Sequence, residues 1–168
     1  MARILSVDIF MVDLPPMVRR TDAIQSFDSQ QTPFVQITDS DGVTGLGYSY
    51  TIGQGGSAVM ALLRDDLIDQ LIGQDAEEIG RIWRDLLFSV HATAVGAISS
   101  LALAAIDVAL WDLRCKRANL PLYKMLGGAK NSVAMYTTEG GWLHIDTADL
   151  VADALAAQAK GVSGWGAG

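Results

Sequence analysis

The sequence predicts an α+β domain over residues 1–128, made of a three-stranded antiparallel meander and a three-helix layer, and then the truncated start of a second domain over residues 129–168. Three observations support this prediction. The first third of the chain alternates apolar and polar residues around a hairpin signal, which is typical of antiparallel strands. The middle repeats apolar residues at helical spacing. The last segment is patterned as strand, helix and strand, which is the unit of a parallel sheet or barrel.

Three strands are expected in the first third, over residues 3–14, 33–38 and 43–50. Pro15 and Pro16 end the first strand, because proline has no backbone N–H to donate to a sheet. Residues 15–31 show no clear period, and we expect a mobile loop there. The other two strands are joined by the hairpin turn Asp39-Ser40-Asp41-Gly42, in which glycine suits a positive φ.

The helical layer begins after a glycine-rich loop. The first helix is expected between Ser57, as its N-cap, and Gly73, which ends it. Apolar residues at a spacing of four form its buried stripe: Val59, Leu63, Leu67 and Leu71. A second helix is expected over residues 76–88, with Asp75 as its cap.

A third helix, over residues 95–117, is apolar nearly all round. We therefore expect it to be the buried central helix, with Trp111 in the core of the layer. A short helical turn over residues 121–126 follows and is closed by two glycines. These elements complete the first predicted domain.

Beyond this point the pattern predicts a strand, a helix and a possible second strand, over residues 132–138, 146–160 and 162–165. A lone β-α unit cannot bury both faces of its strand. The sequence therefore suggests an interrupted second domain.

The composition limits the classes of function. Half of the residues are apolar and the mean hydropathy is +0.27, so the chain can build a packed core. The net charge of -7 repels phosphate backbones, so nucleic acid is not an expected partner. The longest apolar stretch, residues 95–113, is interrupted by serine and aspartate, and neither a membrane span nor a signal peptide is expected. The single cysteine, Cys115, fits a reducing cytoplasm.

Three motifs carry a resemblance to a known family. Residues 104–112 are similar to an A-x-x-D-x-A-L-W-D helix, residues 121–128 to a P-L-x-x-L-L-G-G turn, and residues 41–47 to a D-G-x-x-G-x-G run. Together they resemble the start of an enolase-superfamily enzyme of the mandelate racemase and muconate-lactonising type. The resemblance implies that residues 1–128 are the α+β capping domain and that residues 129–168 are the first β-α unit of a TIM-like barrel.

The resemblance also implies an activity for the parent enzyme. Such enzymes are Mg²⁺-dependent racemases or acid-sugar dehydratases that remove the proton α to a carboxylate, and a small carboxylate substrate and a homo-oligomer are expected. The family's two lysines align with Gly166 and Gly168, and its acidic metal ligands come from later strands. We therefore expect no catalytic or metal-binding residue in this chain, which would be inactive alone. The alternative is a non-catalytic capping-domain fragment that self-associates or serves as a folded module.

Two capping-domain loops, residues 17–28 and 50–55, correspond to loops that close over the barrel mouth and help select the substrate in the family. With the segment after the first barrel strand, they supply eight candidate specificity residues: Arg19, Arg20, Phe27, Tyr50, Ile52, Glu139, Trp142 and His144. An ordinary mobile loop is the alternative. The glycines of residues 53–56 lack the Gly-Lys-Ser/Thr ending of a phosphate-binding loop.

The carboxylates show no metal-ligand spacing. Asp65, Asp66 and Asp69 are expected on a solvated helix face. Asp107 and Asp112 differ because they fall in the apolar third helix, where a buried carboxylate needs a partner. We expect structural contacts for both, to the backbone or to neighbouring basic residues, with a catalytic role as the alternative.

Overall fold

The structure is a computed structural model that describes residues 2–138 and 142–165. The chain divides into two compact units. The first unit contains residues 1–14 and 29–127, and the second contains residues 15–28 and 128–168.

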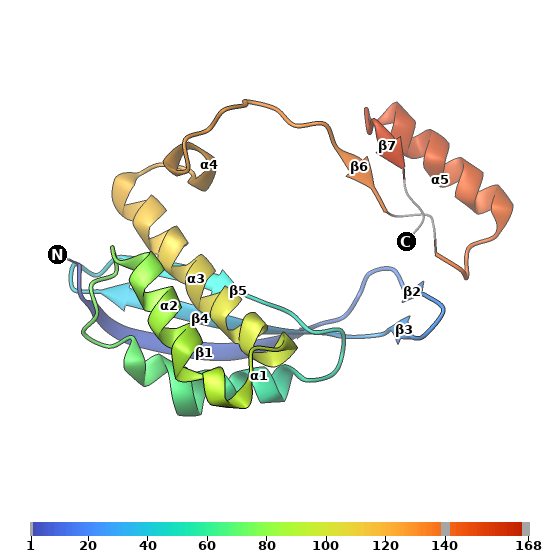
Figure 1. Ribbon diagram of the computed structural model, residues 1–168. Helices are drawn as coiled ribbons and strands as arrows, with labels where there is room; N and C mark the ends of the chain where they lie inside the picture. The colour runs from blue at the N-terminus through green and yellow to red at the C-terminus, as the bar shows by residue number, and fades with distance from the viewer. Residues whose placement is uncertain (1, 139–141, 166–168) are drawn as a thin grey trace. The chain divides into compact units, whose positions relative to one another are not determined.

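The first unit is built on a three-stranded antiparallel sheet in the order β1-β4-β5, and the predicted meander is confirmed (Figure 1). Its strands are β1 (Ile4–Leu14), β4 (Gln30–Asp39) and β5 (Thr44–Tyr48). The central strand begins at Gln30, earlier than predicted, because the ladder with β1 continues until Leu14 lies opposite Gln30.

The predicted hairpin between β4 and β5 is also confirmed. The carboxylate of Asp39 accepts hydrogen bonds from the backbone N–H groups of Asp41 and Val43, each at 2.9 Å. Gly42 adopts φ 80°, the left-handed conformation that glycine enters without steric cost. An Asp side chain that bonds to its own turn in this way is a local device for closing a hairpin.

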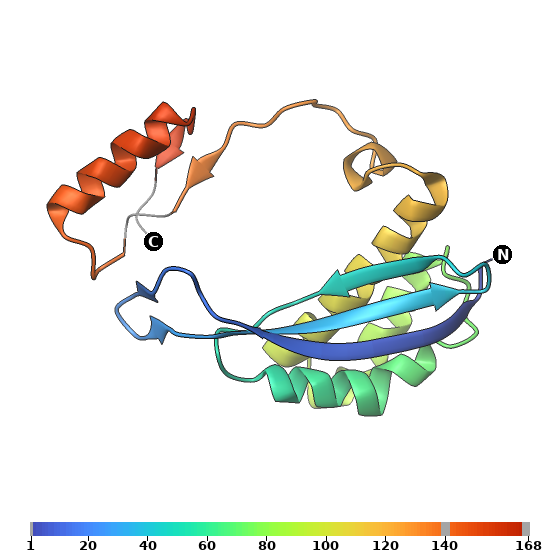
Figure 2. The ribbon, with the colours of Figure 1, turned by 180° about the vertical axis from the view of Figure 1, so that it is seen from behind.

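The helices α2 (Ile79–Ser89) and α3 (Ala97–Ala118) lie against one face of the sheet (Figures 1 and 2). Before them, α1 (Gly56–Leu62) continues into a π-helical turn, η1 (Leu63–Leu67), and a 3-10 turn, η2 (Ile68–Gln70). The predicted apolar stripe is confirmed, since all of its members have no exposed surface: Val59, Leu63, Leu67 and Leu71.

Both predicted helix caps are wrong. Gly55, at φ 90°, is the N-cap of α1 in place of Ser57, and the first N–H of the helix, that of Gly56, donates to the side chain of Gln31 at 2.9 Å. The side chain of Gln31 therefore satisfies one of the N–H groups that have no partner within the first turn of the helix. Asp75 accepts from the N–H of Glu77 at 3.1 Å and closes a turn, so α2 starts only at Ile79.

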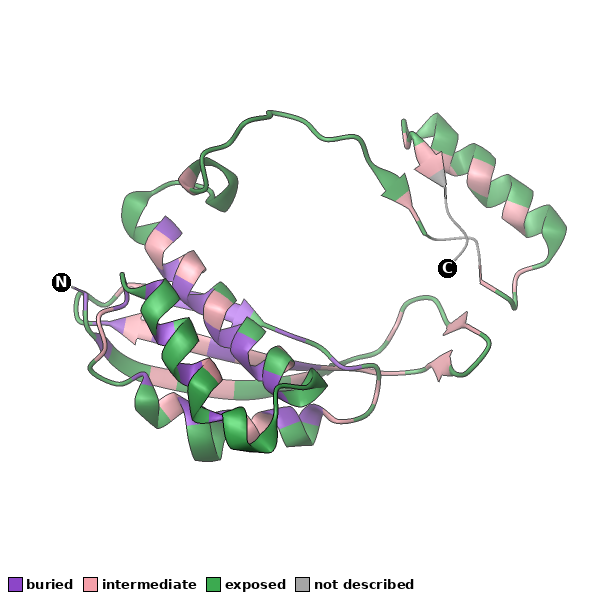
Figure 3. Ribbon diagram, in the orientation of Figure 1, coloured by how far each residue is buried: buried purple, intermediate pink, exposed green. Residues whose placement is uncertain are grey.

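Helix α3 approaches β5 so closely that only glycine fits on the strand. A Cβ atom on Gly47 would lie 2.1 Å from the carbonyl oxygen of Ala105, and one on Gly45 would lie 2.1 Å from that of Ala109. The two glycines of the D-G-x-x-G-x-G run therefore let the helix backbone rest on the strand. Figure 3 shows the buried residues gathered between this helix and the sheet.

The prediction that Trp111 lies in the core is wrong. Its ring is only partly buried, packs against the edge of the core and is covered on one side by the guanidinium of Arg114 at 5.6 Å. Leu103, on the same helical stripe, is 4% exposed. A stripe shows which residues share a helix face, but it does not show how far the neighbouring elements extend along that face.

The second unit contains the predicted strand-helix-strand order. The short helix α4 (Leu122–Met125) ends the first unit. The elements of the second unit after residue 128 are β6 (Tyr136–Thr137), α5 (Thr147–Ala159) and β7 (Gly164–Trp165). The two strands pair in parallel, with Tyr136 opposite Gly164. The first strand is much shorter than the predicted residues 132–138. Across residues 2–138 and 142–165, no helix has the length and apolar character needed to cross a bilayer.

Candidate functional site

The first predicted specificity loop contains a small hairpin, for which residues 15–31 show no strand pattern. Two short antiparallel strands, β2 (Arg20–Thr21) and β3 (Ser26–Phe27), pair within it. The carboxylate of Asp22 accepts hydrogen bonds from the N–H groups of Ile24 at 2.7 Å and Gln25 at 2.8 Å. These local bonds close the turn without an apolar pattern, which is why the sequence carries no strand signal there.

An ion pair lies at the base of this hairpin. The guanidinium of Arg19 is 2.9 Å from the carboxylate of Asp28, and both side chains are well exposed. An exposed pair of this kind adds little stability. It does hold the side chain of Arg19, one of the predicted specificity residues, at the foot of the hairpin.

Three predicted specificity residues from two distant stretches of the chain come together in the second unit. The rings of Phe27 and Trp142 meet edge to face at 5.6 Å, and the guanidinium of Arg20 lies 6.0 Å from the centre of the Trp142 ring. The N–H of Leu143 donates to the carbonyl of Thr21 at 3.3 Å, which fixes the segment after β6 beside β2. We call Arg20, Phe27 and Trp142 the loop cluster.

The loop cluster contains a buried hydrogen-bond donor. The indole Nε1 of Trp142 is buried and has no acceptor among the described residues. A cleft of about 360 Å³ adjoins the ring and is lined by the hairpin turn and by Leu143. A buried N–H without an acceptor is costly, and an oxygen atom of a bound molecule could satisfy it.

The second predicted loop belongs to the first unit and is held by one strand residue. The side chain of Gln31 accepts from Gly56 N–H and from the Thr51 hydroxyl, and its backbone carbonyl accepts from Thr51 N–H at 2.8 Å. Gly53 adopts φ 76°, and a Cβ there would lie 2.7 Å from the Ser29 hydroxyl. The candidates of this loop are both exposed large apolar residues: Tyr50 and Ile52.

The two remaining candidate specificity residues are His144 and Glu139. His144 is exposed and lies in the turn that precedes Asp146, the N-cap of α5. Glu139 and the two glycines aligned with the family's lysines, Gly166 and Gly168, lie outside the described residues.

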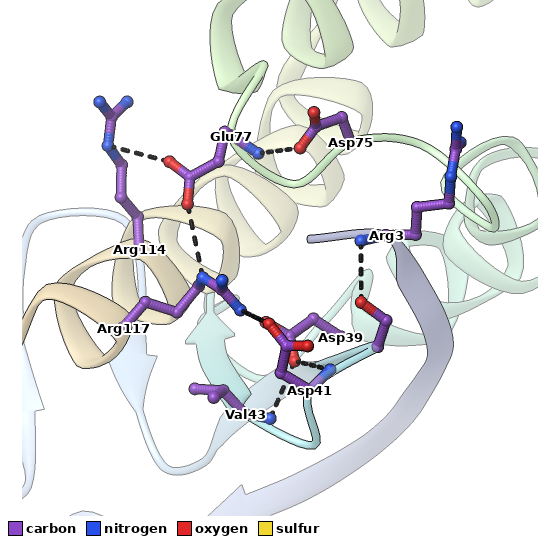
Figure 4. Close-up of polar contacts among 9 residues, drawn as sticks. Arg3, Asp39, Asp41, Val43, Asp75, Glu77, Arg114 and Arg117 are labelled. Carbon is purple, nitrogen blue, oxygen red and sulfur yellow. Dashed lines mark hydrogen bonds and ion pairs between the residues drawn. The ribbon is translucent and has the colours of Figure 1, made fainter. Parts of the chain in front are cut away.

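Sequence reasoning missed an ion-pair network at the far end of the sheet. Arg117, in the last turn of α3, pairs with Asp39 and Asp41 of the hairpin and with Glu77 ahead of α2, as Figure 4 shows. Burial alone would raise the pKa of Asp39, but hydrogen bonds from Val43 N–H, Arg117 and Asp41 N–H, with the charge of Arg117, lower it below its ordinary value. The network connects α3, the β4–β5 hairpin and the turn before α2, and each of these three carboxylates is paired with Arg117.

The two aspartates of α3 have different surroundings. The carboxylate of Asp112 accepts from the N–H of Leu46 at 2.8 Å and pairs with Lys116 at 2.7 Å, which confirms the structural contact expected for it. Among the described residues Asp107 has no hydrogen-bond or ion-pair partner, so the structural contact expected for it is not found. Its side chain lines two surface grooves of about 670 and 450 Å³. Burial raises the pKa of its carboxyl group above the ordinary value.

The described residues do not fit the Mg²⁺ ion that the resemblance implies. Among them, no three His, Cys, Asp or Glu side chains lie close enough together to hold a metal ion. The carboxylates of Asp39 and Asp41 both pair with Arg117. Such an ion needs several oxygen ligands, so this part of the chain supplies no metal site.

Comparisons with known proteins agree with this geometry. Residues 6–127 match the model of the mandelate racemase / muconate lactonizing enzyme N-terminal domain. A 3,6-anhydro-alpha-L-galactonate cycloisomerase of Streptomyces coelicolor is 40% identical over 85% of this chain, and an L-talarate/galactarate dehydratase of Salmonella typhimurium is 34% identical over 77%. The chain spans only 39% and 32% of the lengths of these two relatives.

A solved structure of the L-talarate/galactarate dehydratase from Salmonella typhimurium LT2, with Mg and L-lyxarohydroxamate bound, superposes on nearly the whole chain. The TM-score is 0.90 with 30% sequence identity, and the match covers 98% of this chain and 43% of that chain. Residues of both compact units therefore match residues of the same solved structure.

Proposed function

The chain belongs to the mandelate racemase / muconate lactonizing enzyme family of the enolase superfamily, and on that premise we propose that it forms the N-terminal part of an Mg²⁺-dependent enzyme acting on an acid sugar. The parent reaction would begin with removal of the proton α to the substrate carboxylate. The first 128 residues would cap the active site, and residues 129–168 would start the barrel.

The specificity part of this proposal rests on the buried indole N–H of Trp142, which has no acceptor among the described residues. It lies in the loop cluster, where Arg20 supplies positive charge and Phe27 supplies an apolar wall. Acid sugars combine carboxylate and hydroxyl oxygens with C–H surfaces, and these three side chains match each of those features.

We propose the other candidates as specificity residues as well. Five residues complete the proposed specificity set: Arg19, Tyr50, Ile52, Glu139 and His144. When bound, Mg²⁺ would supply the positive charge that stabilises the enediolate, through ligands that the described residues do not provide. We also propose that the enzyme is a cytoplasmic homo-oligomer.

The test uses the complete reading frame that contains this chain, purified with Mg²⁺ and assayed on galactarate, talarate, mannonate, galactonate and 3,6-anhydrogalactonate. We expect turnover of at least one of them. The variant Trp142→Phe keeps an aromatic ring and removes the N–H, so kcat/KM for that acid should fall about ten- to a hundredfold, the range for one lost hydrogen bond to a charged group. Trp83→Phe, on α2, is the matched control and should leave kcat/KM unchanged.

Two results would count against the proposal. If the complete protein turns over none of these acids, the enzyme class is wrong. If Trp142→Phe and Trp83→Phe behave alike, the loop cluster does not contact substrate.

A non-catalytic folded module is the second candidate, because the first unit has a hydrophobic core of its own. The 168-residue chain assayed alone should show no EDTA-sensitive turnover under either reading. An assay of the complete protein distinguishes the two candidates, because the complete protein would be inactive if it were a non-catalytic module.

A further inference from the structure

Gln31, near the start of β4, is bonded to both ends of one loop. Its side-chain oxygen accepts hydrogen bonds from the Thr51 hydroxyl at 3.2 Å and from Gly56 N–H at 2.9 Å. Thr51 follows β5 and Gly56 begins α1, so the two donors belong to the entering and the leaving ends of the loop. A carbonyl oxygen has two lone pairs, and Gln31 uses both of them on this loop.

The backbone of β4 holds the entering end of the loop as well. Ser49 N–H donates to the Pro33 carbonyl at 3.1 Å, and Thr51 N–H donates to the Gln31 carbonyl at 2.8 Å. These bonds continue the pairing with β4 beyond the last residue of β5. Ser49 and Thr51 are buried, whereas Tyr50 between them is 51% exposed. The alternation of a strand therefore turns the Tyr50 ring outward.

The leaving end of the loop is packed so closely that only glycine fits. A Cβ atom on Gly56 would lie 2.7 Å from the Gln31 side-chain oxygen and 2.9 Å from the sulfur of Met11. The absence of a side chain is what lets the oxygen reach the N–H group. Gly53, at φ 76°, turns the chain between the two bonded ends. Ile52 precedes this turn and is 43% exposed.

We infer that Gln31 is the positioning residue of the loop over residues 50–55, because its side-chain carbonyl closes the base of that loop and sets where Tyr50 and Ile52 meet the substrate. This inference rests on the proposed function, which makes Tyr50 and Ile52 specificity residues. Gln31 acts through the loop and not on the substrate, since both lone pairs of its oxygen are already in use. A loop whose two ends are fixed has less conformational freedom to lose on binding, so it binds more tightly.

The first experiment measures amide hydrogen exchange in the 168-residue chain. Gln31→Met keeps the length of the side chain and removes the acceptor. The Gly56 amide should then exchange about two- to tenfold faster, the range for one lost hydrogen bond. Gln31→Glu keeps acceptor oxygens and should retain the slow exchange. Gln36→Met, on the same strand but opposite Leu46, is the matched control and should leave the exchange of Gly56 unchanged.

The second experiment compares kcat and KM of the complete protein on the acid that it turns over. A contact that is equal in the substrate complex and in the transition state affects KM alone. Gln31→Met should therefore raise KM about two- to tenfold with kcat unchanged, and Gln31→Glu should restore KM. When Tyr50 and Ile52 are both replaced by alanine, Gln31→Met should have no further effect on KM, because Gln31 acts through these two residues.

Circular dichroism melts identify a variant that fails to fold. If Gln31→Met fails, Thr51→Val, which removes one of the two donors, replaces it in the kinetic comparison. Unchanged exchange of Gly56 in Gln31→Met, an unchanged KM, or an equal loss in Gln31→Glu would each overturn the inference. An inactive complete protein would instead refute the proposed function, and the exchange rates would still decide whether Gln31 holds the loop.

Discussion

Arg117, in the last turn of α3, donates from its guanidinium to the carboxylate of Asp39, the last residue of β4, whose side chain has no exposed surface. This contact joins the end of the central helix to the hairpin that β4 begins. Asp39 also accepts the two N–H groups that close the hairpin turn. One buried carboxylate therefore determines both the local turn and its attachment to the helix (Figure 4).

Replacing Asp39 should therefore destabilise the first unit. Asp39→Asn removes the charge and weakens three hydrogen bonds at once, and we expect the free energy of unfolding to fall by about 1.5–3 kcal/mol, the range for hydrogen bonds to charged groups. Urea denaturation followed by circular dichroism measures the change. Asp41→Asn is the control, because the Asp41 side chain is 59% exposed and its loss should have a smaller effect.

The same carboxylate should contribute to the acid sensitivity of the protein. Its pKa is lower in the folded state than the ordinary value of 3.8, so its stabilising contribution is present above that value and is lost as the pH falls through the folded pKa. In Asp39→Asn the loss of stability below pH 3.8 should be shallower than in the wild type. Urea midpoints at a series of pH values test this, and parallel curves for the two proteins would contradict it.

Gly47 should not tolerate a side chain. The Cβ atom of Gly47→Ala would lie 2.1 Å from the Ala105 carbonyl oxygen and 2.4 Å from the Ala109 nitrogen, and both are rigid backbone atoms. We expect a loss of about 1–3 kcal/mol or more, since the helix must move away from the strand. Gly80→Ala, on α2, meets nothing within 4 Å and should stabilise the protein by about 0.5 kcal/mol. Thermal melts compare the two variants, and similar melting temperatures would refute the close approach.

Two residues of α3 should differ in their contribution to stability. Leu113 has no exposed surface, and Leu113→Ala should lower the free energy of unfolding by about 2–5 kcal/mol. Trp111 is larger but only partly buried, so Trp111→Ala should lower it by less than Leu113→Ala. Chemical denaturation ranks the two variants. A larger loss for Trp111→Ala would restore the core position that its helical stripe predicts.

Much of the first unit was predictable because its signals are local. The stripe from Val59 to Leu71 repeats at helical spacing, and the turn at Gly42 combines a side-chain acceptor with a residue suited to positive φ. Family motifs added the capping domain and the start of the barrel, which the structural match supports. Patterns of this kind depend only on neighbours in the chain, so a sequence displays them directly.

The candidate site was predictable only in part. The resemblance pointed to Arg20, Phe27 and Trp142 as specificity residues, but it did not indicate that the three would contact one another. Nor did it indicate that the indole N–H would be buried with no acceptor in the part of the chain that the structure describes. The β2–β3 hairpin escaped prediction because Asp22 closes it through its own side chain, with no alternation of apolar residues in the strands.

The sequence by itself determined the three-stranded meander, the apolar stripe of the first helix and the family of the chain. Only the tertiary structure decided that Trp111 would lie at the edge of the core, that Gln31 would bind the first N–H group of α1, and that Arg117 would reach Asp39. The reason is physical: periodicity records the direction of a side chain relative to its own backbone, whereas burial, capping and ion pairing depend on distant segments that fold against it.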